Sequence, residues 1–349
     1  MLAGEDGSFK RSPVCGPYME LEYVPLGRTG LQVSELAFGT WRFGRETDQG
    51  TIEIDEDRAY ELLDAYEQAG GRFIDTADIY GDGDSETWIG NWLAQRDRSD
   101  YVVASKVYWP TREDNPNFSG LSRTHIRRQV DAILDRLGTD YLDLLYIHRW
   151  DDDTPAEQLM RTLNGLVEDG KVNFLGASTH VPDGWHVAKA NEIAERYGFE
   201  PFTVSQPRYN LVNREVEDTY LDMCEEYDIE LVPWSPLGQG VLTGKYSRED
   251  RAAESEATAS EDDGWKEYYL TEENFDVVDE VEAIAQEVDA TPAQVSLAWL
   301  MHHQQVAAPI VGARTVEQLE ENLGAAAVTL TEDQFERLAD SKASPLDGI

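Results

Sequence analysis

The chain has 349 residues, 41% of them hydrophobic, which is enough apolar material for a large buried core. Its 69 acidic and 29 basic residues give a net charge of -40, and such a surface repels nucleic acid and anionic membranes at ordinary salt. No apolar run is long enough to span a bilayer, and no N-terminal pattern indicates a signal peptide. The two cysteines, Cys15 and Cys224, are too few for a disulfide framework or a cysteine-built zinc site. We therefore expect a soluble, cytoplasmic protein.

The charge imbalance also predicts adaptation to high salt. Repulsion among so many carboxylates destabilises a compact state unless ions screen it, and at molar salt the Debye length falls to about 3 Å. Disorder is the other explanation of a high net charge. The apolar residues, however, are periodic and distributed along the whole chain. We therefore expect a folded, halophilic protein.

The first segments along the chain are a tail and a hairpin. Residues 1–20 are rich in glycine and show no periodicity, so we expect a flexible tail followed by one domain over residues 21–349. Residues 22–34 have the glycine-containing sequence Leu26-Gly27-Arg28-Thr29-Gly30 between two short strand-like segments. This pattern predicts a β-hairpin.

From residue 35 onward, strand-like and helix-like segments alternate. The predicted strands are residues 35–40, 73–77, 101–107, 142–148, 173–178, 202–206, 229–235 and 307–312. The predicted helices are residues 56–69, 85–95, 122–137, 155–169, 185–197, 215–227 and 315–323. Such alternation implies parallel strands with right-handed crossovers, and eight units close into an α/β (β/α)8 TIM barrel. A doubly wound open sheet is the alternative, but the Gly-x-Gly-x-x-Gly turn that it would place after an early strand is absent from the sequence.

Two stretches depart from this alternation. Residues 247–273 follow the seventh predicted strand and are polar and acidic until Trp265, Tyr268 and Tyr269. A long insertion at this end of a barrel is either a lid or binding loop, or a solvated acidic loop, and the sequence allows both. Residues 291–303 predict an extra helix that begins with a threonine cap and a proline.

Polar side chains stand where three successive predicted strands end. Asp75, Lys106 and His148 come at these ends, and Tyr80 lies on the loop after the first of them. A phenol is a weak acid because its ordinary pKa is about 10, and a buried lysine beside it favours the phenolate. Taken singly, each residue has an ordinary explanation, such as a turn cap, a packing aromatic, a surface lysine or a core histidine. Together they predict a proton-transfer site at the carboxyl-terminal end of a barrel.

A series of motifs in the same order resembles the aldo-keto reductase superfamily over residues 21–340. The motifs are Asp75-Thr76-Ala77-x-x-Tyr80-Gly81, Gly83-x-Ser85-Glu86, Ser105-Lys106, Ile147-His148-Arg149-Trp150-Asp151, Gly176-Ala177-Ser178-Thr179, Val204-Ser205-Gln206-x-x-Tyr209-Asn210, Trp234-Ser235-Pro236-Leu237-Gly238 and Gly312-Ala313-Arg314-x-x-Glu317-Gln318-Leu319-Glu320-Glu321-Asn322-Leu323. The sequence is most similar to the branch with bacterial general reductases and the β subunits of voltage-gated potassium channels.

The resemblance implies NADPH-dependent reduction of a small aldehyde or ketone, on a barrel with an N-terminal β-hairpin and long loops at its C-terminal face. It implies that Tyr80 is the general acid, that Lys106, paired with Asp75, lowers the Tyr80 pKa, and that His148 orients the carbonyl. The residues implied in cofactor binding are Gly39, Thr40, Trp41, Asp75, Ser178, Thr179, Gln206, Trp234, Ser235, Leu237, Lys245, Arg314, Gln318, Glu321 and Asn322. The candidate substrate contacts are Trp41, Tyr108 and Trp109.

Alternatives remain for the cofactor and for the function. Arg314 is a suitable fork for a 2'-phosphate, and Lys245 is the other obvious cation, so NADPH is expected and NADH is the alternative. Thr179 stands where the family commonly has Asn and offers no amide. A regulatory or redox-sensing subunit that binds NADPH and turns over slowly is the alternative function. A metal-dependent barrel hydrolase is less favoured, because the six histidines form no strand-end His-x-His pattern.

Overall fold

Eight parallel strands form the centre of the computed structural model, which describes residues 20–47, 49–112, 114–178, 184–249 and 265–341. In the sheet they follow the order β10-β3-β4-β5-β6-β7-β8-β9. The strands are β3 (Ala37–Gly39), β4 (Phe73–Asp75), β5 (Val102–Val107), β6 (Leu142–Ile147), β7 (Val172–Ala177), β8 (Phe202–Ser205), β9 (Glu230–Leu231) and β10 (Ile310–Val311). Seven of them lie within the predicted strands and β7 begins one residue before its predicted segment, so the predicted (β/α)8 barrel is confirmed.

The two edges of this sheet meet through backbone hydrogen bonds. Leu231 N donates to Gln305 O (2.8 Å), and Ala307 N donates back to Leu231 O (2.9 Å). Strands β9 and β10 are shorter than the predicted segments 229–235 and 307–312. Pro233 and Pro309 lie in those segments and have no N–H to donate to a strand ladder, which accounts for the early ends.

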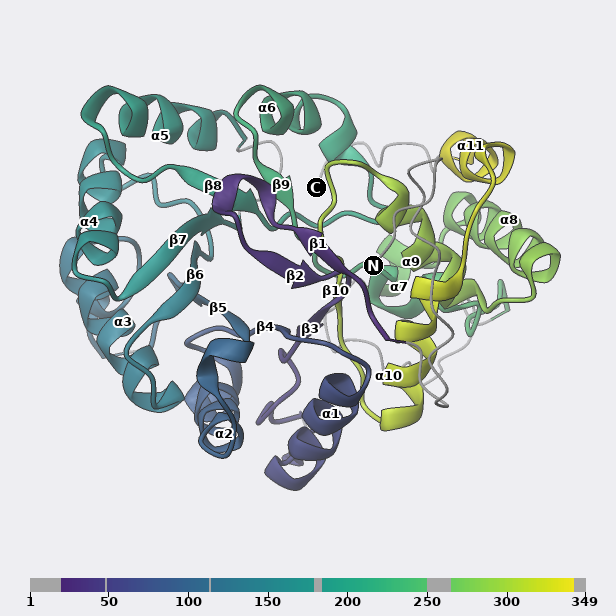
Figure 1. The fold of residues 1–349 in the computed structure, drawn as a ribbon. Coiled ribbons are helices and arrows are strands. Elements are labelled where there is room, and N and C mark those ends of the chain that lie inside the picture. The colour runs from purple at the N-terminus through teal and green to yellow at the C-terminus, as the bar shows by residue number, and fades with distance from the viewer. Residues whose placement is uncertain (1–19, 48, 113, 179–183, 250–264, 342–349) are drawn as a thin grey trace, which may run out of the picture.

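Helices surround the strands, as Figure 1 shows. They are α1 (Glu56–Gln68), α2 (Asp84–Leu93), α3 (Arg123–Leu137), α4 (Ala156–Glu168), α5 (Gly184–Tyr197), α6 (Tyr220–Glu226), α7 (Trp265–Tyr269), α8 (Glu272–Val288), α9 (Pro292–His302), α10 (Val316–Leu323) and α11 (Glu332–Asp340). The predicted helix 215–227 is divided into a 3-10 turn, Glu215–Glu217, and α6, because Thr219 between them has φ -150°. Helices α7, α8 and α11 were not predicted from the sequence.

Helix α3 illustrates why the helices form where the sequence places them. The Ser122 hydroxyl accepts a hydrogen bond from His125 N at 3.3 Å, and Gly138 ends the helix in the left-handed conformation with φ 62°. Ile126, Val130 and Ile133 are fully buried on one face of the helix. Their spacing of three to four residues therefore directs one side of the helix onto the barrel strands.

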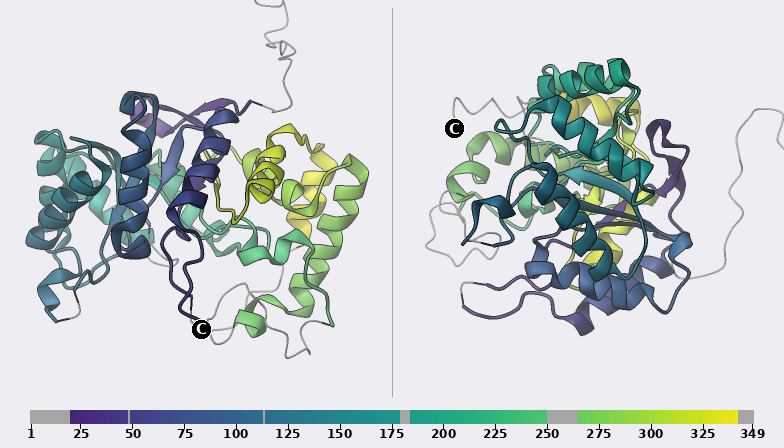
Figure 2. Two further views of the ribbon diagram at one scale, coloured as in Figure 1. Left: turned by 90° about the horizontal axis from the view of Figure 1, so that it is seen from below. Right: turned by 90° about the vertical axis from the view of Figure 1, so that its left-hand side faces the viewer.

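The N-terminal hairpin closes one end of the barrel. Strands β1 (Tyr23–Pro25) and β2 (Gln32–Ser34) pair antiparallel, as predicted. Leu26 and Val33 of the hairpin pack in one cluster with the inward-facing Phe73, Ala104 and Leu144. Figure 2 shows the hairpin at one end of the barrel and residues 40–47 and 49–55 projecting from the opposite end. The carboxyl-terminal ends of the strands are therefore left open for a site.

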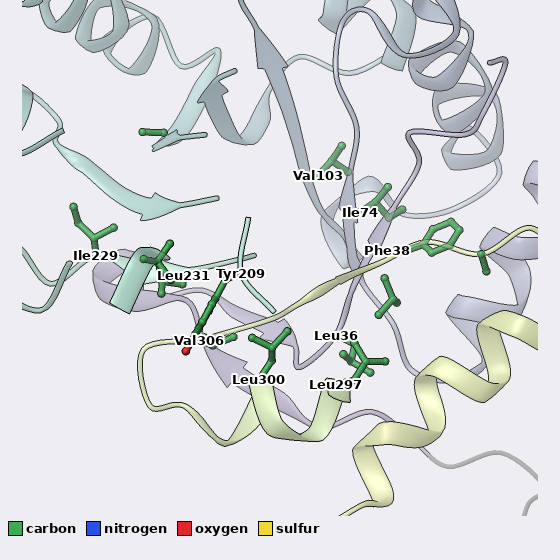
Figure 3. Close-up of a cluster of buried hydrophobic side chains, with 14 of the residues drawn as sticks. Leu36, Phe38, Ile74, Val103, Tyr209, Ile229, Leu231, Leu297, Leu300 and Val306 are labelled. Carbon is green, nitrogen blue, oxygen red and sulfur yellow. The ribbon is translucent and has the colours of Figure 1, made fainter. Parts of the chain in front are cut away.

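A second core lies between the strands and the outer helices. In it Phe38, Ile74 and Val103 point outward from β3, β4 and β5, and Leu297 and Leu300 approach from α9 (Figure 3). The last part of the acidic insertion joins this core, because Trp265 and Tyr269 of α7 are 5% and 3% exposed. That part is thus packed rather than solvated, and residues 250–264 lie outside the described residues. None of the described helices is both long and apolar enough to cross a membrane.

Candidate active site

The alternation of side chains along two strands brings an acid and a lysine into the barrel interior. Phe73 and Asp75 share one face of β4, and Ala104 and Lys106 share one face of β5. Asp75 is paired with Ala104 in the register of the two strands. Phe73 and Ala104 lie in the interior cluster, so Asp75 and Lys106 point to the same interior, nearer its open end.

Lys106 is the centre of the predicted catalytic group. Its Nζ donates to Asp75 Oδ1 at 2.5 Å, to the Thr76 carbonyl at 2.9 Å and to the Tyr80 hydroxyl at 3.2 Å. The side chain of Lys106 is 1% exposed and that of Asp75 is 4% exposed. A lysine so deeply buried is stable only when its charge is paired. The structure thus joins Asp75, Lys106 and Tyr80 as the sequence predicted.

Burial and charge act in opposite directions on the Tyr80 hydroxyl. Burial raises the pKa of Tyr80 above its ordinary value of 10.0, and the charge of Lys106 lowers it by less. The lysine acts in the expected direction, but the expected net lowering is not found, because burial outweighs it. Burial alone would lower the pKa of Lys106, but Asp75 and Tyr80 raise it above 10.5 overall. Near neutral pH the lysine is therefore charged and the phenol keeps its proton, which is the form a general acid needs.

His148 and two aromatic residues lie beside the phenol. The His148 ring is 6.0 Å from that of Tyr80, edge to face at 77°. Trp109 meets the His148 ring at 6.2 Å and the Tyr108 ring at 5.2 Å. Tyr108 and Trp109 are half-buried, so they form part of the wall beside His148. Trp41 is in a different environment. Its exposed ring instead lies under the Arg45 guanidinium group, whose central carbon is 4.1 Å from the ring centroid.

A layer of polar side chains fixes Asp75 from behind. Gln206 Nε2 donates to Asp75 Oδ2 at 2.7 Å, and the Ser178 hydroxyl donates to the Gln206 carbonyl at 3.1 Å. The Thr40 hydroxyl donates to the Asp75 carbonyl at 2.9 Å. Thr40, Ser178 and Gln206 are therefore joined by hydrogen bonds to Asp75, directly or through one another. Thr179 lies outside the described residues.

The turn after β9 has the backbone bends expected of a phosphate-binding loop. Ser235, Gln239 and Gly240 have φ of 54°, 52° and 95°, in the left-handed region. A side chain at position 240 would come within 2.8 Å of Lys245 Nζ, so glycine there leaves room around the ammonium group. Successive bends of this kind aim backbone N–H groups toward one point, which suits an anion. The turn also holds Leu237, and it follows Trp234, which packs against the interior cluster.

A second cationic group lies beyond this turn. Arg314 Nε donates to Glu53 Oε1 at 2.7 Å, and Arg42 and Arg45 also pair with the Glu53 carboxylate. The three arginines and Lys245 are cationic donors of the kind that bind phosphate, so the described residues fit the implied cofactor. Arg42, Arg45 and Glu53 were missed from the sequence. One signal was available: Arg42 and Arg314 each stand three residues after neighbouring strands, β3 and β10.

The remaining residues that the sequence predicts for cofactor binding have contacts mainly with neighbouring loops and strands. The Gln318 side chain accepts from Arg314 N at 2.9 Å, and the buried Asn322 side chain donates to the Gly312 carbonyl at 3.3 Å. Both therefore shape the loop that carries Arg314. Glu321 is exposed, with its carbonyl accepting from Gln294 at 2.9 Å. Gly39 packs against Ile310, since a Cβ there would lie 2.5 Å from its side chain. Within the described ranges, no three His, Cys, Asp or Glu side chains gather as metal ligands would.

The ion cluster gives a pH-dependent stability prediction for Glu53→Gln. Burial alone would raise the pKa of Glu53, but Arg42, Arg314 and Arg45 hold it below 4.5. A lowered carboxylate pKa stabilises the fold above the ordinary pKa, and this stabilisation is lost as the pH falls through the folded-state value. We expect the variant to be about 2 kcal/mol less stable near pH 7, the order of a charged hydrogen bond, with the difference vanishing in acid. Urea denaturation of both proteins as a function of pH measures this; a constant difference would contradict the ion-pair explanation.

Comparisons with known proteins agree with this geometry. The sequence profile described as the aldo/keto reductase family matches residues 35–343. The chain is 35% identical over 324 residues to norsolorinic acid reductase of Aspergillus flavus, covering 91% of this chain and 79% of that protein. It is 35% identical over 334 residues to the uncharacterized oxidoreductase YrpG of Bacillus subtilis, covering 93% and 97%. It is also 35% identical over 311 residues to a probable voltage-gated potassium channel subunit beta of Oryza sativa subsp. japonica, covering 87% and 91%.

Proposed function

Because the chain belongs to the aldo/keto reductase family, we propose that it reduces aldehydes or ketones to alcohols with NADPH, and that Tyr80 is the acid. The observation that carries this proposal is the 3.2 Å contact between Lys106 Nζ and the Tyr80 hydroxyl at the open end of the barrel. A protonated phenol beside a buried ammonium group is suited to donate its proton to an oxygen that gains negative charge. The family and the branch expected from the sequence are both confirmed by the relatives.

In the proposed reaction, this chain's residues manage the proton and the orientation of the carbonyl. When bound, the dihydronicotinamide supplies the hydride. Tyr80 gives the proton of its hydroxyl to the carbonyl oxygen, and Lys106 stabilises the phenolate that is left. Asp75 keeps Lys106 charged and in place. His148, in edge contact with the Tyr80 ring, holds the carbonyl oxygen, and Tyr108 and Trp109 line the approach.

We propose that the phosphorylated dinucleotide is the preferred cofactor. Thr40, Ser178 and Gln206 border the reacting end, and Arg314 and Lys245 border the phosphate end. Titration of tryptophan fluorescence with NADPH and with NADH in molar KCl tests the preference. We expect tighter binding of NADPH; equal affinities would contradict the assignment of the cations to a phosphate.

A regulatory subunit is the second candidate function. The 35% identity to a probable voltage-gated potassium channel subunit beta is the observation that favours it. Such a protein would keep NADPH bound through dialysis and would reduce no aldehyde at a measurable rate. The same fluorescence titration followed by a panel of aldehydes separates the two functions.

The net charge predicts a strong dependence of stability on salt. We propose that the protein works in a high-salt cytoplasm, because a chain of charge -40 repels itself unless ions screen the carboxylates. The free energy of unfolding should therefore rise steadily as KCl is increased from low to molar concentration. Urea denaturation at a series of KCl concentrations measures the effect, with sucrose as a control for general exclusion from the surface. Equal stability at low and molar KCl would rule out the halophilic adaptation.

A further inference from the structure

Four cations gather at one place in a chain that is otherwise strongly acidic. Arg42 and Arg45 lie on the segment after β3, Arg314 follows β10, and Lys245 follows the turn after β9. Strands β3 and β10 are neighbours in the sheet, so their following segments meet. The whole chain has only 29 basic residues against 69 acidic ones. Lys245 lies near enough to Arg314 and Arg42 for their charges to lower its pKa, so four basic residues gather here in an acidic chain.

One carboxylate, that of Glu53, is held among these cations. Its side chain is 9% exposed and pairs with Arg42, with Arg45 at 3.5 Å and with Arg314 at 2.7 Å. The backbone also fixes it, because Glu53 N donates to the Arg45 carbonyl at 2.8 Å and Glu46 bridges to Ile52 beside it. Glu53 is thus a built part of the cluster and not a mobile surface acid.

Cations outnumber the carboxylate in this group of side chains. Arg42, Arg45 and Arg314 each pair with the Glu53 carboxylate, and among the described residues no carboxylate forms an ion pair with Lys245. Burial lowers the pKa of Lys245, and the positive charges of Arg314 and Arg42 lower it further. These groups therefore repel one another, which is the state that an added anion relieves. Forked guanidinium groups with an ammonium group match a phosphate in both charge and hydrogen-bond geometry.

We propose that Arg42, Arg45, Arg314 and Lys245 form a phosphate subsite and that Glu53 is the residue that sets its selectivity. Glu53 holds the three guanidinium groups together, and it also removes one unit of positive charge from the place where a phosphate binds. It therefore weakens binding of the phosphorylated dinucleotide relative to the non-phosphorylated one. This inference rests on the proposed NADPH-dependent function and adds a determinant that the motifs did not indicate.

The test is the ratio of the NADH Kd to the NADPH Kd in the full-length protein. We expect Glu53→Gln to bind NADPH about 10-fold more tightly, the effect of one unit charge at about 6 Å in a medium of effective dielectric constant about 40. The Kd for NADH should not change, and the gain should shrink as KCl is raised. Glu46→Gln is the matched control, because Glu46 is an exposed acid whose backbone bridges to Ile52, the residue before Glu53. It should leave the ratio as it is in the wild type.

A second variant keeps the proposal testable if Glu53→Gln folds poorly. Arg45→Gln removes the cation with the longest contact to Glu53, 3.5 Å, and should lower the affinity for NADPH without changing that for NADH. A ratio that falls or stays constant in Glu53→Gln, or stays constant in Arg45→Gln, would overturn the inference. The experiment measures binding and not turnover. If the wild-type protein binds NADPH but reduces no carbonyl compound, that result contradicts the proposed function and leaves the inference about Glu53 standing.

Discussion

Replacing Tyr80 by Phe will lower kcat for carbonyl reduction by about 100- to 10,000-fold, the range that a positioned general acid contributes. The hydroxyl lies 3.2 Å from Lys106 Nζ, and in the proposed reaction it gives its proton to the substrate oxygen. Phenylalanine keeps the ring and its edge contact with His148, so the wall of the site is preserved. The Kd for NADPH, measured by fluorescence, should therefore stay at the wild-type value.

Tyr108→Phe is the matched control for that experiment. It removes a phenol that is half-buried at the same end of the barrel and in ring contact with Trp109, but not joined to Lys106 by any described contact. It should keep most of the turnover. If Tyr80→Phe reduces aldehydes at the wild-type rate, Tyr80 is not the acid.

Replacing Lys106 by Met will give the largest loss of stability among single changes at the site. The lysine is 1% exposed and forms a 2.5 Å ion pair with Asp75, so its removal leaves a buried carboxylate without a cation to balance its charge. Breaking one partner of a buried pair costs about 3 to 5 kcal/mol. Urea denaturation in molar KCl should show a loss of this size, and turnover should be lost as well, because the phenolate of Tyr80 would have no stabilising charge.

The double variant Asp75→Asn/Lys106→Met separates these two effects. It removes both charges and keeps an oxygen for the hydrogen bond from Gln206, so most of the lost stability should return. Turnover should stay lost, because the double variant still has no cation beside the Tyr80 hydroxyl. A single variant as stable as the wild type, or a double variant that regains activity, would show that the pair has another role.

The fold and the centre of the site could be predicted because both depend on local pattern. Alternating strand and helix periodicity placed all eight strands, and strand ends placed Asp75, Lys106 and Tyr80, which the structure brings into contact. The helices α8 and α11 were missed, although Thr271 and Thr331 cap them and accept hydrogen bonds from Asn274 N and Gln334 N. Helix α8 lies between β9 and β10 in addition to α9, and α11 comes after α10, so a count of eight strand-helix units gave no place for either of them.

The balance of charge at the site could not be predicted from the sequence. The net rise in the Tyr80 pKa depends on how deeply the side chain is buried, and the sequence motif does not indicate the depth of burial. The grouping of Arg42, Arg45 and Arg314 around Glu53 brings together residues that are as far apart in the sequence as Arg42 and Arg314. Contacts of that kind follow from which strands are neighbours, and they become visible only in the folded chain.

The most direct test of the central claim is a count of NADPH consumed and alcohol formed when the wild-type protein is mixed with one aromatic aldehyde in molar KCl. We predict one alcohol for each NADPH, no consumption without the aldehyde, and about 100-fold less alcohol, or lower still, when the Tyr80→Phe variant is used for the same time. Firmly bound NADPH that is never consumed, with any aldehyde tried, would show that this chain does not work as a reductase.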